Sequence, residues 1–349
     1  MNDFEKKMSN LFNKKYCCFT GSGTTAIYLI LKALNLQNKK IVYPTITCMA
    51  PVNAAVYAGY EPIFCDVSLN NYTMDLNSLK NILDEYDVGV VVPTHVYGHK
   101  CNMKEISKVA HEKGCFVLED AAQTISLSEF SDASIMSFGH TKILETEQGG
   151  GAIFTDDERL YGNLKIEKAL IKIKPKNINE LFDTYREKYY YIMKNKQEGF
   201  NNYKEIYNLQ INSKDTFIYD ADENNEILEK VKDIDVIIKE RNKRGKLYEK
   251  YLDNSLVDKA QGMYDVLWRY SFLYKGNREK LLEKVREKNI DISSWYPALY
   301  HFYLGEKKQE FLNSKIVEEK IVNLWVNVNR AEEKIKQDIQ IINEIMRKV

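Results

Sequence analysis

The sequence predicts an α/β protein with a large domain, whose mainly parallel sheet lies between helices, and a smaller C-terminal α+β domain. Short apolar segments alternate with amphipathic ones over the first 155 residues. Such segments are typical of parallel strands buried on both faces and of the helices that cover them. The 349-residue chain is 44% hydrophobic and 29% charged, with only 6 Pro and 16 Gly. This composition excludes a disordered or collagen-like chain and allows a sizeable core.

The spacing of apolar residues sets the expected elements of the large domain. Residues 22–36 repeat apolar side chains at helical intervals, and residues 88–92 (VGVVV) form a nearly all-valine run typical of a buried strand. Further helices are expected at 51–58, 76–85 and 103–113, and further strands at 40–43, 61–66, 115–118, 134–138 and 152–155.

The remainder of the chain is richer in Lys, Glu, Asn and Tyr. We expect the large domain to span 1–215, with a helical insertion at about 160–215, and the small domain to span 216–349. Residues 183–195 (DTYREKYYYIMKN) interleave basic and aromatic side chains, as a nucleic-acid surface does. The neutral balance of the chain favours the other interpretation, a helix with one tyrosine-rich packing face.

Charge and cysteine content narrow the class of protein further. Lys+Arg and Asp+Glu both number 50, so no net field attracts nucleic acid or an anionic membrane. We expect no nucleic-acid partner, no membrane span and no secretory signal. The six cysteines form no CxxC pair, which favours buried free thiols in a reducing compartment and therefore a cytoplasmic protein.

Three motifs carry candidate chemistry, and the first is Gly21-Ser22-Gly23-Thr24-Thr25 at the start of the helix at 22–36. Small residues let the backbone approach a ligand, and the free N–H groups of a helix N-terminus bind anions such as phosphate. An ordinary helix cap explains the same residues, and no Lys follows as in a P-loop.

The second motif, Glu119-Asp120-Ala121-Ala122-Gln123, places two acids at the carboxyl end of a buried strand. Ligands of open α/β sheets bind at this edge, and a carboxylate there needs a cationic partner. A protonated heterocyclic nitrogen is one such partner, and a helix-capping aspartate is the alternative.

The third motif is Ser137-Phe138-Gly139-His140-Thr141-Lys142, followed by glycines at 149–151. A lysine held beside an aldehyde can act as a nucleophile in Schiff-base chemistry, whereas most lysines are simply solvated. Together the three motifs supply what pyridoxal 5′-phosphate needs: a phosphate site, an acid for the ring nitrogen and a lysine for the aldehyde.

The stretch from about residue 19 to residue 155 resembles the DegT/DnrJ/EryC1/StrS family of sugar aminotransferases, which have the fold-type I architecture of pyridoxal phosphate enzymes. The resemblance rests on seven segments in order: GSGTTAIYLILKAL, VYPTITCMAPVNAAVYAGYEPIFCDV, YTMD, VPTHVYGHKCNM, VLEDAAQ, SFGHTK and GGGAIFTDD. The tail agrees more loosely, through WYPALYHF at 295–302 and NLWVNVNRAEEKIKQDI at 323–339.

The resemblance implies roles for individual residues. Lys142 would bond to the aldehyde of the cofactor and act as the catalytic base, Asp120 would pair with the ring nitrogen, and Gln123 would contact the ring hydroxyl. The family implies a ping-pong transfer from an amino acid, usually glutamate, to a nucleotide-linked keto-sugar.

The phosphate would be held by Ser137, Gly23 and Thr24. The resemblance also implies a homodimer whose subunits share the active site, and no catalytic metal.

The sequence departs from the family pattern in three places. Cys48 stands where an aromatic residue commonly stacks on the cofactor ring. Residues 215–225 contain no arginine, although many members carry one there that reaches the partner's phosphate site. The insertion at 160–215 is also longer than is typical.

Other residues are candidates for the substrate side: Tyr97, His140, Trp295, Tyr296 and His301. Structural packing explains the aromatic ones equally well. His95 and His99 lack a third metal ligand at a suitable spacing, so a structural or substrate-side role is favoured for them.

Three alternatives to an aminotransferase remain open. A sugar dehydratase of the same fold has histidine in place of the lysine, and Lys142 argues against it although His140 is close in sequence. A non-catalytic relative would not be expected to retain Asp120, Gln123, Ser137 and Lys142. A dinucleotide-dependent oxidoreductase would need a GxGxxG turn, which the sequence lacks.

Overall fold

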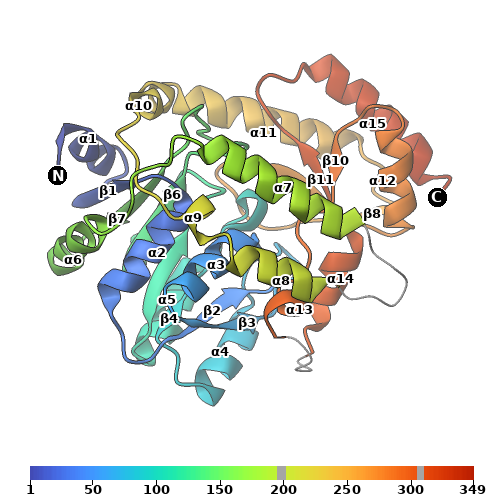
Figure 1. Cartoon of the computed structure of the whole chain (residues 1–349). Helices are drawn as coiled ribbons and strands as arrows, with labels where there is room; N and C mark the ends of the chain where they lie inside the picture. The colour runs from blue at the N-terminus through green and yellow to red at the C-terminus, as the bar shows by residue number, and fades with distance from the viewer. Residues whose placement is uncertain (195–201, 305–309) are drawn as a thin grey trace.

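The computed structural model describes residues 1–194, 202–304 and 310–349, and it is organised around two sheets (Figure 1). The larger sheet has seven strands in the order β1-β7-β6-β5-β4-β2-β3. These strands are β1 (Tyr16–Thr20), β2 (Lys40–Pro44), β3 (Glu61–Cys65), β4 (Val90–Val91), β5 (Phe116–Asp120), β6 (Ala133–Ser137) and β7 (Gly151–Thr155). The expected strands are thus present, whereas β1 was not predicted.

The sheet is mainly parallel, as predicted, with one reversed strand. β2 pairs in parallel with β3 and β4, β4 with β5, and β5 with β6. β7 is antiparallel to both β6 and β1. The chain returns from β6 to β7 through a loop without a crossover helix, and such a connection can join only antiparallel neighbours.

Helices cover both faces of this sheet because successive strand residues point to opposite sides. In β2, Ile41 and Tyr43 pack with α2 and α3, whereas Val42 packs with α4 and α5. The helices of this region are α1 (Asp3–Leu11), α2 (Gly23–Leu34), α3 (Met49–Tyr57), α4 (Leu76–Glu85), the short 3₁₀ helix η1 (Val96–Gly98), α5 (Met103–Glu112) and α6 (Glu158–Lys168).

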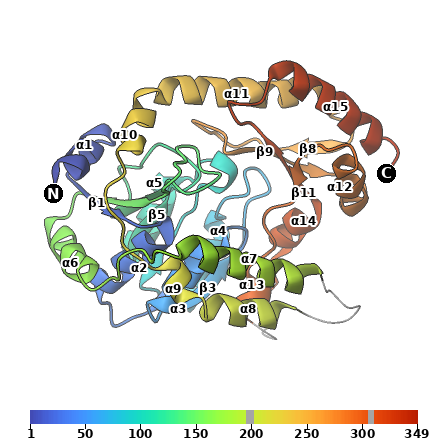
Figure 2. The same ribbon diagram turned by 45° about the horizontal axis from the view of Figure 1, so that its top comes forward.

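A second sheet forms the C-terminal part of the molecule (Figure 2). Its strands are antiparallel, in the order β10-β11-β9-β8: β8 (Val257–Lys259), β9 (Arg269–Tyr274), β10 (Ile292–Ser293) and β11 (Ile321–Trp325). One face packs on α11 (Ile234–Tyr251), α12 (Arg278–Arg286) and α15 (Glu332–Met346). The other face contributes Leu273 and Ile321 to a core that it shares with the loops of the large sheet. The division at 215/216 stays a prediction.

The chain between β7 and β8 contains the predicted insertion, of which residues 195–201 lie outside the described ranges. The remaining elements are α7 (Ile178–Lys194), α8 (Tyr203–Ile211), α9 (Lys214–Phe217), α10 (Asn225–Lys232), α13 (Tyr300–Tyr303) and α14 (Leu312–Lys320). Tyr185 of α7 stacks on Tyr189 and meets Phe217 edge-on at 4.9 Å between ring centroids. Tyr191 is 70% exposed on the opposite side of the helix. This one-sided packing is the arrangement that the tyrosine-face interpretation predicts.

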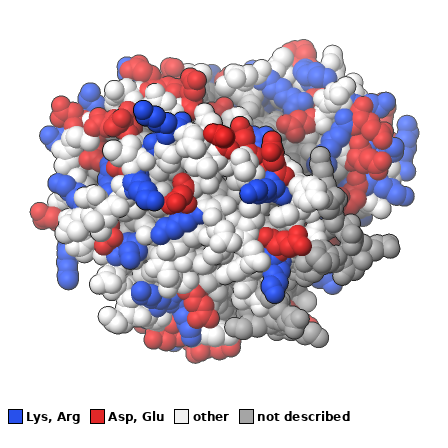
Figure 3. All heavy atoms as spheres, in the orientation of Figure 1, with Lys and Arg blue, Asp and Glu red and all other residues white. Residues whose placement is uncertain are grey.

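The surface and the cysteines match a neutral protein without crosslinks. Acidic and basic side chains are interspersed over the face shown in Figure 3. All six cysteines are free thiols, and five of them are buried. Among the helices of the described ranges, none has the length and apolar character of a membrane span.

We predict that Ile30→Ala lowers the free energy of unfolding by about 2–5 kcal/mol, because Ile30 of α2 is fully buried against the large sheet. Urea unfolding followed by circular dichroism measures the change. The matched control is Leu170→Ala, since Leu170 is 74% exposed and its loss should change stability by less than about 0.5 kcal/mol. Equal losses in the two variants would contradict this account of the core.

Candidate active site

The candidate residues gather at one edge of the seven-stranded sheet. Asp120 and Ser137 are the last residues of the parallel strands β5 and β6, and Cys48 and Tyr97 follow the parallel strands β2 and β4. Gly151 begins the antiparallel strand β7 and therefore lies at the same edge. Strand direction alone brings together segments that are more than a hundred residues apart, at the edge where open α/β sheets bind ligands.

The two acids of the second motif have different surroundings because they point to opposite faces of β5. Glu119 accepts hydrogen bonds from His95 Nε2 at 2.8 Å, from the Ser128 amide at 3.0 Å and from the hydroxyls of Ser131 and Ser134. Burial opposes ionisation of Glu119, but these bonds outweigh it and hold the pKa of its carboxyl below the ordinary value. Glu119 is thus a satisfied structural carboxylate.

His95 completes this pair and is equally buried. Burial disfavours the charged imidazole, but its partners Cys101 and Glu119 raise the pKa of His95 to about 10. His99 lies in the same loop, and within the described ranges no group of three metal-ligating side chains occurs. For both histidines, the structural or substrate-side role that the spacing favoured stays a prediction.

Asp120 is only 2% exposed, and its carboxylate accepts one hydrogen bond, from the Ala122 amide at 3.0 Å. No cationic side chain in the described part of the chain forms an ion pair with it. Burial accordingly raises the pKa of Asp120, and the Ala122 amide and the Lys142 amine oppose the rise only in part. A buried carboxylate without a cation is costly unless a ligand supplies one.

Gln123 and two tyrosines form the wall beside Asp120. The Gln123 side-chain oxygen accepts from the Tyr97 amide at 2.8 Å, and its nitrogen donates to the Tyr296 hydroxyl at 3.4 Å. The rings of Tyr97 and Tyr296 are parallel, with centroids 6.0 Å apart. The Tyr97 hydroxyl donates to the Trp295 carbonyl. The structure thus brings Tyr97, Trp295 and Tyr296 together with Gln123.

The start of α2 forms a cradle with the end of β6. A Cβ atom added to Gly23 would lie 2.9 Å from Cβ of Ser137, so only glycine allows this approach. The hydroxyls of Thr24 and Ser137 have no hydrogen-bond partner within the described residues and are free for a ligand. The Ser22 and Thr25 hydroxyls are not, because both donate to the Phe217 carbonyl. Nothing in the first motif indicated the segment that occupies these two hydroxyls.

Lys142 lies half-buried on the loop between β6 and β7, and its amine has no partner among the described residues. Thr141, next to it, is held at both backbone groups: its carbonyl accepts from Trp268 Nε1 at 2.7 Å, and its amide donates to Glu145 at 2.6 Å. Burial raises the pKa of the Cys48 thiol, and Lys142 is the strongest group opposing that rise. Lys142, Cys48 and Asp120 therefore share one electrostatic environment.

The side chains of the other two predicted substrate residues, His140 and His301, make their contacts with residues outside this group. The His140 side chain is 94% exposed, with Glu145 at 3.7 Å as its nearest acid. His301 pairs with Glu318 at 2.9 Å and stacks on Tyr203 of α8 at 4.6 Å between centroids. Trp268 is the site residue that sequence reasoning missed, because no local pattern marked it.

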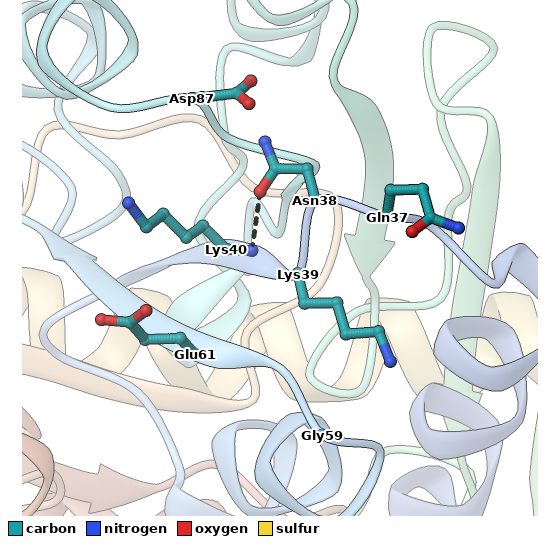
Figure 4. Close-up of a pocket in the computed structure, with 7 residues that line it drawn as sticks. All are labelled: Gln37, Asn38, Lys39, Lys40, Gly59, Glu61 and Asp87. Atoms are coloured by element: carbon teal, nitrogen blue, oxygen red, sulfur yellow. Dashed lines mark hydrogen bonds between the residues drawn. The ribbon is translucent and has the colours of Figure 1, made fainter.

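The hollow in Figure 4 lies at the opposite edge of the sheet, where Lys40 and Glu61 begin β2 and β3. Its volume is about 560 Å³, and within its lining the Lys40 amide donates to the Asn38 side-chain oxygen at 3.1 Å. It contains none of the candidate residues and is open and polar, so we do not assign the chemistry to it.

The residues at the carboxyl edge fit pyridoxal 5′-phosphate. Asp120 is a buried carboxylate that lacks a cation, as a partner of a protonated ring nitrogen should be. Gly23, Thr24 and Ser137 leave an approachable backbone and two free hydroxyls for a phosphate. The Lys142 amine also has no hydrogen-bond partner in the described ranges, and it is the amine of this group that could bond to the aldehyde.

Comparisons with known proteins agree with this fit. An uncharacterized protein of Methanocaldococcus jannaschii is 25% identical over 98% of this chain and 89% of its own length. The GDP-perosamine synthase of Escherichia coli O157:H7 is 31% identical over 45% of this chain and 45% of the synthase. The match thus spans less than half of the length of that named enzyme.

Solved structures confirm the predicted fold. NtdA of Bacillus subtilis, solved with bound PMP, superposes with a TM-score of 0.72 and 21% identity, covering 98% of this chain and 76% of NtdA. The model of the DegT/DnrJ/EryC1/StrS aminotransferase family matches residues 1–178, just over half of the 349 residues. The chain belongs to this family of pyridoxal 5′-phosphate-dependent aminotransferases, as its motifs predicted.

Proposed function

We propose that this protein transfers an amino group from an amino acid, glutamate in the first instance, to a keto-sugar carried on a nucleotide. The observation that carries the proposal is the Asp120 carboxylate. It is buried, it has no ion-pair partner among the described residues, and it is close enough to the Lys142 amine to be influenced by it. Two relatives support the substrate classes by name. They are the GDP-perosamine synthase and a Bacillus subtilis 3-oxo-glucose-6-phosphate:glutamate aminotransferase, the latter 31% identical over 46% of this chain and 37% of the relative.

The proposed roles follow from the surroundings of each side chain. Asp120 holds a proton on the ring nitrogen, because a buried carboxylate is stabilised by an adjacent positive charge. Ser137, Thr24 and the Gly23 backbone bind the phosphate, assisted by the N-terminus of α2. Gln123, which Tyr97 and Tyr296 fix in orientation, donates to or accepts from the ring hydroxyl.

When bound, pyridoxal 5′-phosphate carries the amino group between the two half-reactions and accepts the electron pair that remains when the α-proton leaves. Lys142 is the residue that would hold the aldehyde of the cofactor until the amino donor binds. Its free amine then removes the α-proton of the donor and, in the second half-reaction, returns a proton to the former carbonyl carbon of the sugar. Cys48 packs against the site in place of an aromatic ring.

Lys142 rather than His140 is the base in this proposal. The His140 side chain points into solvent, whereas the Lys142 amine is close enough to influence Asp120 and Cys48. This difference favours amino transfer over the dehydratase alternative, in which a histidine takes the place of the lysine.

We further propose that two copies form a homodimer with shared active sites and that the protein works in the cytoplasm. The segment that carries the phosphate-binding arginine in many relatives lacks one here, so a lysine or tyrosine of a second copy would complete the cradle. The six free cysteines favour a reducing compartment.

We predict that Lys142→Ala lowers the transfer rate by at least about 10²- to 10⁴-fold, because it removes both nucleophile and base. The rate is measured as 2-oxoglutarate formed from glutamate. After borohydride reduction, peptide mass mapping should place the cofactor on Lys142 in the wild type. Lys104→Ala, at an exposed position of α5, is the matched control and should keep full activity. Turnover by Lys142→Ala at the wild-type rate would exclude this lysine as the base.

We predict that Asp120→Asn keeps the cofactor bound but slows the half-reaction with glutamate by about 10²- to 10³-fold, because an amide cannot stabilise the protonated ring nitrogen. Stopped-flow absorbance of the cofactor measures the single half-reaction. Asp87→Asn, a change at an exposed position, should leave the rate unaltered. An undiminished rate in Asp120→Asn would remove Asp120 from the mechanism.

A further inference from the structure

Two residues of the candidate site have a backbone conformation that their side chains disfavour. Within the described ranges, the non-glycine residues with positive φ are three asparagines, which adopt this region readily, and Tyr72, Tyr97 and Thr141. Tyr97 (φ 60°) donates its amide to Gln123, and Thr141 (φ 72°) directly precedes Lys142. For a β-branched residue such as Thr141 this conformation is an outlier, and it persists only where the surrounding structure holds it.

Trp268 binds the carbonyl groups of both residues. Its backbone N–H donates to the Tyr97 carbonyl at 3.0 Å, and its indole Nε1 donates to the Thr141 carbonyl at 2.7 Å. Trp268 lies just before β9 and is more than a hundred residues from either acceptor in sequence. The small sheet thus fixes two loops at the carboxyl edge of the large sheet through one residue.

Packing leaves the indole of Trp268 little freedom to turn. Trp268 is 4% exposed, its ring is parallel to that of Tyr296 with centroids 6.2 Å apart, and the Arg269 guanidinium lies 4.6 Å from its centroid. Tyr296 is in turn parallel to Tyr97. A buried indole needs an acceptor for its N–H, and an immobile one presents that N–H in a fixed direction.

The bonds to Thr141 act on the two peptide groups that precede Lys142. The Thr141 carbonyl belongs to the planar group that joins Thr141 to Lys142, and the Thr141 amide, which donates to Glu145 at 2.6 Å, belongs to the group before it. The Lys142 amide closes the turn by donating to the Gly139 carbonyl at 3.1 Å. These backbone bonds therefore set the direction in which the Lys142 side chain leaves the chain.

We propose that Trp268 is a positioning residue for the reaction. Its indole N–H keeps Thr141 in the left-handed conformation and thereby directs the Lys142 amine toward the cofactor. The inference rests on the proposed function, since it takes Lys142 as the reacting amine. Trp268 itself acts through Thr141 and has no part in bond making or proton transfer.

The experiment compares the wild type with Trp268→Phe, which keeps a stacking ring but removes the indole N–H. Stopped-flow absorbance measures how fast the full-length protein, freed of cofactor, captures pyridoxal 5′-phosphate, and borohydride reduction with peptide mass mapping identifies the lysine that captures it. Trp268→Phe should slow capture by Lys142 and lower kcat with glutamate by about 10- to 100-fold, because small displacements of a reacting group have effects of this size. The KM for glutamate should change by less than about twofold, since the lost bond orients the amine and does not hold the donor.

A compensating substitution separates positioning from loss of packing. Asparagine adopts the left-handed conformation more readily than threonine, so Thr141→Asn makes the loop less dependent on the bond from Trp268. In the double variant Trp268→Phe/Thr141→Asn, capture and kcat should return to within about threefold of the values for Thr141→Asn alone. A change at position 141 would not repair packing that was lost with the indole.

Trp325→Phe is the matched control. Trp325 of β11 pairs in register with Arg269 and also contacts its guanidinium, but its Nε1 has no hydrogen-bond partner in the described part of the chain. Removal of this N–H should leave capture and kcat unaltered. If Trp268→Phe fails to fold, Glu145→Ala breaks the other bond to Thr141 and should slow capture in the same way, again with recovery in the presence of Thr141→Asn.

The outcomes separate this inference from the proposed function. Unchanged capture and kcat in Trp268→Phe, with amino transfer intact, would overturn the positioning role alone. Equal losses in Trp268→Phe and Trp325→Phe, or a loss that Thr141→Asn does not repair, would show that the indole acts only through packing and would also overturn it. If Thr141→Asn restores capture but the wild type transfers no amino group to any keto-sugar, the positioning role is supported and the proposed function is not.

Discussion

The direction of the parallel strands determines where the chemistry of this molecule lies. β2, β4, β5 and β6 all run the same way, so the polar residues that end or follow them meet at one edge of the sheet. The strands themselves are buried on both faces and have no room for unpaired polar groups. The reversed strand β7 respects the same constraint, because it starts rather than ends at that edge and brings its glycine there.

Glu119 and Asp120, the neighbouring acids of β5, carry the same functional group but have different surroundings because of this constraint. Glu119 points to one face and meets an imidazole, an amide and two hydroxyls of its own chain, so it contributes to folding. Asp120 points to the other face and accepts a single amide hydrogen bond, so among the described residues its carboxylate has no ion-pair partner. The alternation of strand side chains alone separates the structural acid from the proposed catalytic one.

Much of this could be predicted from the sequence, because the residues concerned lie in short contiguous motifs. Glycines before a helix, acids at a strand end and a lysine after the next strand are visible without a structure. Trp268 was not predictable in this way, since it lies just before β9 of the other sheet, more than a hundred residues from Lys142, and reaches the neighbouring Thr141 only through tertiary packing. His140 shows a different limit: it is two residues from Lys142 in sequence, yet proximity in sequence does not fix the direction of a side chain on an irregular loop, and its imidazole is exposed.

The contact between the start of α2 and residues 217–219 requires particular side chains on α2, whereas residues 217–219 contribute backbone groups to it. On the α2 side it requires particular residues: a Cβ on Gly21 would lie 2.3 Å from the Tyr219 carbonyl oxygen, and the bonds come from the hydroxyls of Ser22 and Thr25. On the other side the acceptors are backbone carbonyls, which every amino acid possesses. The hydrogen bonds themselves therefore do not depend on which side chains stand at 217–219, and divergence between relatives could weaken any recognisable signature on that side. A segment can thus be essential to the architecture of a site and still leave no trace in a comparison of sequences.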